Sequence, residues 1–550
     1  MRQRKHPAGL PYLFLTEMWE RFGYYLMIGI FFLYMTDSEK GGLAFSKKDA
    51  SDVYGTFIAL VYLTPFIGGL LADKLLGYRT AITIGGILMG LGYMGLGYMG
   101  MTGAGMDVFM LSLILMIIGN GFFKPNITTL LGALYNDERY RERKDTGFSI
   151  FYMGINVGAF VCNFFAAYLR NTFGWGEAFM AAGVGMFLGV IVFWAGNRHY
   201  KDVDVRQTSK PGDMSIASVF GRVLLPAAIA GFLGWMIPGN VFGSDSTDAF
   251  LFGALPVVLF YITLLFRLDA DDRKPVKALL AIYGVVIVFW AVFKQNGTAL
   301  TTWAESYTDR ELPAKVVPAA RAFGIVQDVK YARDSFPVID DQFRTAKDSN
   351  GITIKEISYP PYFKNVPEDR LPKEGSETYL VSTEIFQSIN PFFVVAFTPL
   401  VIAFFSFLRI RKREPSTPGK IFLGLLITSL STLVMIGAVS SCENGLVKSS
   451  AWWLISTYAV VTLGELCLSP MGLSLVSKLS PPRITALMMG GWQLATSIGN
   501  KLSGVLASLW DSYDDKAGFF WVNLLLTMAA ALAILFMLKW LSRVVREHGG

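Results

Sequence analysis

The chain has 550 residues, of which 53% are apolar and only 17% are charged. Apolar runs near or above eighteen residues recur along it, a pattern that excludes a water-soluble domain and predicts an all-α polytopic protein embedded in a lipid bilayer. The net charge of +7 fits the excess of Lys and Arg that membrane proteins keep on their inner side. We therefore expect no nucleic-acid partner, and the three cysteines imply no disulfide framework.

The apolar runs predict fourteen transmembrane helices. In chain order they cover residues 10–35, 50–73, 79–100, 108–134, 146–168, 176–195, 218–238, 248–266, 277–303, 384–408, 420–440, 451–477, 484–509 and 517–541. Lys and Arg are concentrated in the short loops on the side of the two termini, which places both termini in the cytoplasm.

The helices group as six, two and six. We expect an N-terminal six-helix bundle at 1–196, a basic linker with two additional helices at 197–275, and a C-terminal six-helix bundle at 276–550. Two six-helix bundles around a central path are the architecture of the major facilitator fold, which holds its substrate near the bilayer midplane.

A polar segment at 304–383 interrupts the C-terminal bundle. It contains a Pro-Pro pair at 360–361 and one short alternating run at 351–357. We expect an extracytoplasmic loop with a small hairpin. Loops of this length are usually functional or disordered, and the sequence leaves a functional role and simple decoration open.

Three ionisable residues lie in the first predicted span, at Glu17, Glu20 and Arg21. A charge at the centre of a membrane helix costs roughly 2.5–3.5 kcal/mol. The i, i+3 and i, i+4 spacings place the three on one helical face, where they can pair and face a polar interior. This arrangement indicates a site that handles protons or ions.

Two further charges lie deep in predicted spans. Lys124 stands about ten residues from either end of its helix, too far to reach the interface by snorkelling. We therefore expect it to face a pore. Glu465 is the matching anomaly in the second half, and it is either a structural hydrogen-bonded acid or a fixed negative site for a positive group of the substrate.

Two amides pose a similar question. Asn156 lies between Gly154 and Gly158 inside a span, where its amide needs partners, whereas the two glycines are typical of helix packing. Asn390 begins the first span after the long loop and lies nearer a helix end.

Aromatic residues make up 14% of the chain, so packing or interfacial roles are the default for any one of them. Proximity to the charged cluster or to a proline-containing helix raises the interest of three tyrosines: Tyr24, Tyr25 and Tyr62.

A set of motifs runs in order through both halves of the chain. They are Glu17-x-x-Glu20-Arg21, Phe22-Gly-Tyr24-Tyr25, Tyr62-Leu-Thr-Pro65, Phe123-Lys124-Pro125-Asn126, Phe151-Tyr152-x-x-Ile155-Asn156-x-Gly158 and Gly464-Glu465-x-x-x-Ser469-Pro470. Together they resemble the proton-dependent oligopeptide transporter (POT/PTR) family. The two additional helices are similar to those of prokaryotic members, which implies a multi-pass protein of a bacterial inner membrane.

The resemblance implies roles for these residues. Arg21 and Lys124 would attract the peptide carboxylate, and Glu465 with Asn156 and Asn390 would hold the amino end. The aromatic members of the implied substrate site are Tyr24, Tyr25, Tyr62, Trp290 and Trp492. Proton coupling would involve the cluster on the first helix together with one lysine: Glu17, Glu20, Arg21 and Lys124.

The chain also departs from the family pattern. Apolar residues surround Ile28, where many bacterial members have an arginine, and Phe293 and Lys294 replace its usual acidic partner. We therefore expect another partner for Lys294, a carboxylate or a lipid headgroup, and a larger share of the switching for the cluster on the first helix. Gly55 occupies the place of the histidine that animal members use.

The resemblance and the charges together predict a symporter that imports di- and tripeptides with protons by alternating access. The alternative is a transporter of the same fold for another small solute, such as nitrate or a peptide-like metabolite. An intramembrane enzyme is not favoured, because the spans hold no histidine and no zinc-protease or Gly-x-Gly-Asp motif. We expect no cofactor and no metal, and a monomer.

Overall fold

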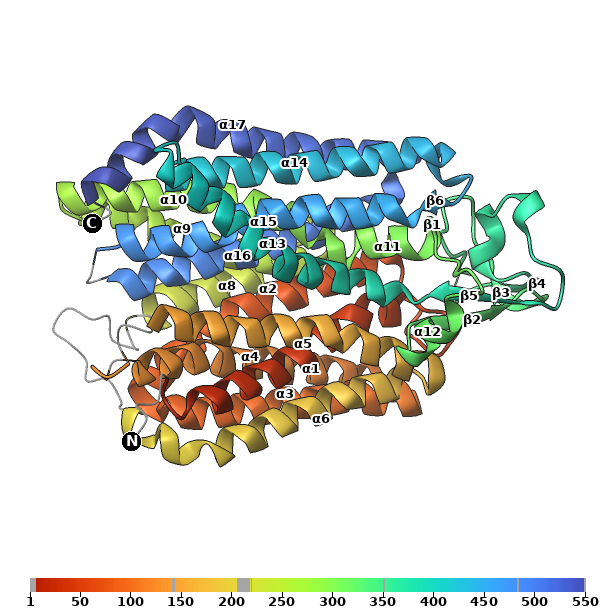
Figure 1. Cartoon of the computed structure of the whole chain (residues 1–550), viewed down its shortest axis with the longest axis horizontal. Helices are drawn as coiled ribbons and strands as arrows, with labels where there is room; N and C mark the ends of the chain where they lie inside the picture. Colours follow the sequence, from red (N-terminus) through yellow and green to blue (C-terminus); the bar gives the residue numbers. More distant parts are fainter. Residues whose placement is uncertain are drawn as a thin grey trace.

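The computed structural model describes residues 6–135, 137–140, 144–204, 218, 220–349, 352–481 and 484–548. Its long helices run side by side along one axis (Figure 1). The start of α1 and the end of α17 lie at one end of this axis, which we call the terminal end. The strands gather at the opposite end, which we call the strand end.

Most of the described chain is α-helical. They are α1 (Leu10–Thr36), α2 (Lys47–Leu71), α3 (Tyr78–Thr102), α4 (Met106–Leu134), α5 (Lys144–Thr172), α6 (Trp175–Ala195), α8 (Leu225–Trp235), α9 (Asp245–Arg267), α10 (Ala270–Phe293), α11 (Ala299–Ser306), α12 (Val317–Ala322), α13 (Ile389–Ile410), α14 (Thr417–Ser441), α15 (Ala451–Leu479), α16 (Thr485–Ser508) and α17 (Lys516–His548).

Eleven helical segments of the described chain are long and apolar enough to cross a membrane. The other three predicted spans correspond to α1, which carries three charges, to the apolar helix Phe220–Trp235, which is short, and to α16, which is rich in polar residues. The predicted polytopic all-α membrane fold is therefore confirmed.

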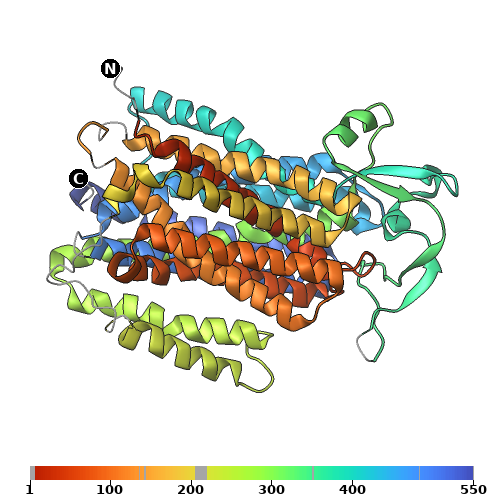
Figure 2. The ribbon, with the colours of Figure 1, turned by 90° about the horizontal axis from the view of Figure 1, so that it is seen from below.

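The helices pack around two large hydrophobic cores. Helices α1 to α6 share one core, which extends to Tyr200. Helices α9, α10 and α14 to α17 share the second, joined by Val223 and by Ala59 of α2. The α8–α9 hairpin lies at the rim of the molecule (Figure 2, yellow-green), packed against α2, α10 and α16. We call α1–α6 the N-group and α10–α17 the C-group.

Serine side chains start several helices that begin at a loop. Ser46 accepts a hydrogen bond from the Asp49 backbone at 3.0 Å, and Ser244 accepts one from Thr247 at 3.2 Å. Each bond satisfies a backbone N–H that has no partner within its helix. The polar residues at these helix starts thus set where α2 and α9 begin.

The predicted span 277–303 lies within the apolar segment Ala270–Ser306, which is long enough to cross a membrane, but the segment is not one unbroken α-helix. Helix α10 ends at Phe293, a 3₁₀ turn covers Lys294–Gly297, and α11 follows. The turn packs against Tyr54 of α2 so closely that a Cβ on Gly297 would collide with the tyrosine hydroxyl. Only glycine allows this approach, and the break turns Lys294 toward the N-group.

The segment predicted as a loop with a small hairpin is a folded module. Its strands form three two-stranded sheets, one of them completed by β6 beyond the module. The strands are β1 (Thr308–Asp309), β2 (Val326–Lys330), β3 (Asp334–Pro337), β4 (Lys355–Ser358), β5 (Glu377–Val381) and β6 (Ser449–Ser450). The module has its own apolar core, built from Tyr331, Tyr362, Phe363 and Leu380.

Candidate substrate and proton-coupling site

The charged cluster of α1 is buried and internally paired. Glu17 is 4% exposed, Glu20 0% and Arg21 3%. Arg21 Nη2 donates to Glu20 Oε1 at 2.6 Å, and Arg21 Nε lies 3.4 Å from Glu17 Oε1. The i, i+4 pair expected from spacing is therefore formed, and Glu20 pairs with its chain neighbour. Glu17 is the more loosely held acid, since its Oε2 has no hydrogen-bond partner among the described residues.

The ring of Tyr62 joins a cation from each helix group. Lys124 Nζ of α4 lies 4.1 Å from the ring centroid, and Lys294 Nζ lies 5.6 Å from it. Cations over an aromatic face are attracted by its negative quadrupole. Lys124 also interacts electrostatically with Glu17 and Glu20, so the ring connects the α1 cluster to the C-group.

Glu465 of α15 is fixed by an amide from α13. Asn390 Nδ2 donates to Glu465 Oε2 at 3.1 Å and to Thr462 Oγ1 at 2.9 Å. Both amide hydrogens are thereby used, and the carboxylate is oriented from one side. Glu465 also interacts electrostatically with Lys294. The acid and amide singled out from sequence are thus neighbours.

Asn156 uses its amide within its own helix. Its Nδ2 donates to the Tyr152 carbonyl at 3.0 Å, and no described contact joins it directly to Glu465. The phenol hydroxyls of Tyr152 and Tyr25 lie within electrostatic range of the Glu465 carboxylate. Tyrosines therefore lie between the α1 cluster and the acid of α15. Tyr152 was not among the predicted site residues, although it precedes Asn156 in one of the motifs.

The remaining aromatic candidates differ in their surroundings. Arg21 lies over the Tyr24 ring, 5.1 Å from its centroid, so this tyrosine covers the charged cluster. Trp290 stands beside Lys294, whose Nζ is 5.4 Å from its ring. Trp492 is 4% exposed and packs against Tyr283 within the C-group. Its ring supports that core in this conformation.

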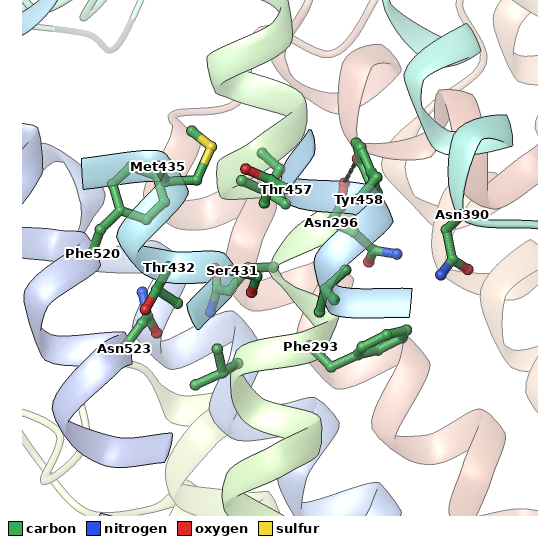
Figure 3. Close-up of a pocket in the computed structure, with 14 residues that line it drawn as sticks. Phe293, Asn296, Asn390, Ser431, Thr432, Met435, Thr457, Tyr458, Phe520 and Asn523 are labelled. Carbon is green, nitrogen blue, oxygen red and sulfur yellow. Dashed lines mark hydrogen bonds between the residues drawn. The ribbon is translucent and has the colours of Figure 1, made fainter. Parts of the chain in front are cut away.

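A small pocket of about 30 Å³, lined by apolar as well as polar side chains, adjoins Asn390 inside the C-group (Figure 3). This volume suffices for a water molecule with polar partners. Its polar lining residues are Gln295, Asn296, Asn390, Ser431, Thr432, Thr457, Tyr458 and Asn523. The pocket was not predicted, because its side chains come from five separate helical segments.

Hydrogen bonds and ion pairs close the two groups against each other toward the strand end. Arg170 Nε of α5 lies 3.1 Å from Glu384 Oε1, which precedes α13. Asp52 Oδ1 of α2 lies 2.6 Å from Lys501 Nζ of α16. Amides of α5 add two bonds to hydroxyls near the start of α13: Asn163 to Ser388 at 3.0 Å and Asn171 to Ser382 at 2.6 Å.

Beyond this closure, a cavity of about 580 Å³ lies between the helices and the strand module. Charged residues of both signs line it, among them Lys40, Arg310 and Glu39. Glu39 remains exposed to the cavity, yet partial desolvation at the cavity wall, reinforced by the neighbouring carboxylate of Asp37, raises its pKa to about 7. The cavity is separated from the Tyr62 region by the closed helix ends.

Comparison with known protein families identifies the family to which this chain belongs. The family model described as "PTR2: POT family" matches residues 79–326 and 371–522, well over half of the chain. The chain belongs to the POT family. This confirms the resemblance drawn from the motifs, and POT proteins are transporters rather than enzymes.

Relatives and solved structures agree over almost the whole chain. A di-/tripeptide transporter of Lactococcus lactis subsp. lactis is 28% identical, with 97% of this chain and 95% of that protein covered. The uncharacterized transporter YclF of Bacillus subtilis is 29% identical, with 96% and 93% covered. A crystal structure of the peptide transporter POT in complex with sulfate is 27% identical, with a TM-score of 0.75 and coverage of 100% and 98%.

The departures from the POT pattern have structural counterparts. Ile28 is 7% exposed and packs in the N-group core. Lys294 has no carboxylate within ion-pair distance among the residues described, and it faces the rings of Tyr62 and Trp290 instead. Gly55 lies where α2 crosses α16, and a Cβ there would be 2.8 Å from Gly504 Cα. A histidine at this position would push the two helices apart.

Proposed function

We propose that this POT protein imports di- and tripeptides together with protons by opening its two ends alternately. The observation that carries the proposal is that charges of both signs from both groups gather around Tyr62. Arg21 and Lys124 come from the N-group, and Lys294 and Glu465, held by Asn390, come from the C-group. A short peptide is a zwitterion, so it needs one cationic and one anionic anchor. The names of the relatives, di-/tripeptide transporters among them, support the same substrate class.

Each anchor has a specific role in this proposal. Arg21 and Lys124 attract the peptide carboxylate. Glu465, oriented by Asn390, accepts hydrogen bonds from the peptide ammonium, and Asn156 contributes from α5. The aromatic residues Tyr24, Tyr25, Tyr62, Trp290 and Trp492 position the backbone and the side chains.

Protons act through the α1 cluster. Arg21 is shared between Glu17 and Glu20, and protonation of either acid weakens its hold on the guanidinium. Arg21 then becomes free to bind the peptide carboxylate, which couples proton binding to substrate binding. Because the two groups must move to release the peptide, this exchange biases the conformational equilibrium.

The orientation follows from the distribution of basic loops. We infer that the terminal end faces the cytoplasm and the strand end faces outward from a bacterial inner membrane. Residues 1–196 and 276–550 act as the two bundles, with 197–275 between them, and one copy of the chain suffices. In this conformation the strand end, which would face outward, is closed.

The test is uptake of labelled dialanine into proteoliposomes under an inward proton gradient. We expect accumulation that unlabelled di- and tripeptides suppress and that nitrate and free alanine do not. Accumulation of nitrate, or suppression by nitrate alone, would favour the alternative solute. A proton ionophore should abolish accumulation, and liposomes without protein give the background.

A further inference from the structure

We propose that the α8–α9 hairpin is a working part of the strand-end gate. Through hydroxyls at the start of α9 it holds Asp52 against Lys501 and so favours the state in which the strand end is closed. We call Asp52, Thr56, Ser244, Ser246, Thr247 and Lys501 the clasp. The inference rests on the proposed alternating access, and it assigns a task to the two helices that lie outside both six-helix groups.

The ion pair at the centre of the clasp is enclosed. The Lys501 side chain is 0% exposed and that of Asp52 is 19% exposed. Lys501 Nζ donates to Asp52 Oδ1 at 2.6 Å and to Thr56 Oγ1 at 2.6 Å. A buried ammonium without its partner is strongly destabilising. Separation of α2 from α16 at this level therefore requires water or another anion to reach Lys501.

The hairpin supplies three more bonds to the same carboxylate. Ser244 Oγ and Thr247 Oγ1 each donate to Asp52 Oδ1 at 2.8 Å, and Ser246 Oγ donates to Oδ2 at 2.5 Å. Hydrogen bonds to a charged acceptor are stronger than neutral ones. The hairpin thus contacts Asp52 with more donors than Lys501 does.

These hydroxyls are held in place by the hairpin itself. The buried carboxylate of Asp248 accepts the backbone N–H groups of Val241 and Phe242 at 2.6 and 2.8 Å, which fixes the turn before α9. The hairpin is also tied to α16, because Tyr261 Oη donates to the Leu487 carbonyl at 2.7 Å. The hairpin is thus tied to α16 and to α2 at once, because Ser246 Oγ lies 3.2 Å from both Lys501 Nζ and Thr56 Oγ1.

Helices α2 and α16 are in close backbone contact next to the clasp. Gly55 and Gly504 meet at the crossing of α2 and α16, where either Cβ would lie less than 3 Å from the other backbone. Asp52 stands one turn from this crossing. Opening of the strand end must therefore break the ion pair and the hairpin bonds together, and the hairpin adds to the barrier.

The experiment measures the strand-end distance directly. Spin labels at Lys48→Cys and Asp514→Cys, two exposed positions beside α2 and α16, are introduced after the three native cysteines are replaced by serine or alanine. Pulsed electron-electron distances are recorded in lipid without substrate. We expect one short distance for the parent, and a ratio of open to closed population raised about tenfold or more by Lys501→Met.

The hairpin is tested by the double variant Ser246→Ala with Thr247→Val, which removes two of its three donors to Asp52 and also the acceptor that Ser246 offers to Lys501. We expect its open-to-closed ratio to rise by about three- to thirtyfold. The matched control is Thr263→Val on the same helix, whose hydroxyl donates to the Phe260 carbonyl at 2.7 Å; it should leave the distances unchanged. If the double variant disturbs folding, Ser246→Ala alone takes its place.

Two outcomes would overturn the proposal. Parent-like distances in the double variant beside an opened Lys501→Met would show that the ion pair closes the strand end without the hairpin. Parent-like distances in both would remove the clasp from the gate. Neither readout uses peptide or protons, so failure of dialanine uptake alone would count against the proposed function and not against the clasp.

Discussion

Asn390 donates to both Glu465 and Thr462, at 3.1 and 2.9 Å, and so fixes the Glu465 carboxylate within the C-group. A carboxylate held in this way presents its remaining lone pairs in a fixed direction. It can therefore form directed hydrogen bonds with an ammonium group in addition to attracting its charge.

Glu465→Gln should weaken dialanine binding about ten- to hundredfold, because it removes a charge from a hydrogen-bonded anchor while it keeps the shape. Competition against labelled dialanine in detergent or liposomes measures the change. Thr462→Val, which leaves Glu465 and Asn390 in contact, is the control and should cost much less. Equal losses for the two variants would contradict a specific role for the acid.

Glu20→Gln should abolish proton-driven accumulation and leave exchange of labelled for unlabelled dialanine across the membrane. The neutral amide can still contact Arg21 but cannot take up a proton at this position. The control is Thr16→Val, a buried neighbour on α1 whose hydroxyl donates to the Tyr12 carbonyl at 2.7 Å. Full accumulation by Glu20→Gln would move the coupling to Glu17, which the same assay tests by Glu17→Gln.

The variants Tyr62→Phe and Tyr62→Leu should differ in their KM for dialanine. Phenylalanine keeps a ring face for Lys124 and Lys294, whereas leucine removes it, at about 0.5–2 kcal/mol for a cation–π contact. We therefore expect KM for dialanine to rise more in the leucine variant. The same KM in both would mean that the hydroxyl, and not the ring face, matters. Initial uptake rates over a range of dialanine concentrations give the answer.

The single variants Arg170→Met and Glu384→Gln should each destabilise the closed strand end more than the double variant that carries both changes. The side chains are 10% and 0% exposed, and a single change leaves the other charge buried without a partner. Thermal unfolding in lipid and the strand-end distances both report this double-mutant cycle. Additive effects would indicate that the pair is not coupled in the closed state.

Acid should favour the closed strand end through Glu39, which lines the cavity next to it. Its pKa is raised from 4.5 to about 7 there, so the closed state binds more protons than a state in which the carboxyl is solvated. The closed population should thus grow as the pH falls from about 7 toward about 4.5. Glu39→Gln should reduce the pH dependence of the strand-end distance. An unchanged dependence would assign it to other groups, such as the α1 acids.

The sequence by itself determined the membrane character, the positions of the long apolar helices and which charges lie inside them. Long apolar runs are a local property, and a glutamate or lysine in the middle of one is conspicuous whatever surrounds it. The pairing of Glu17 with Arg21 also follows from helical spacing alone.

Only the tertiary structure decided which distant residues meet. Asp52 and Lys501 lie near helix ends, where charges are ordinary, and their pairing depends on how α2 crosses α16 at Gly55. Lys294 faces Tyr62 because α10 ends at Phe293. The polar Lys-Gln-Asn-Gly sequence that follows is compatible with a break, but it does not say which helix the lysine will meet. Such contacts depend on the relative placement of helices hundreds of residues apart, and local periodicity carries no information about it.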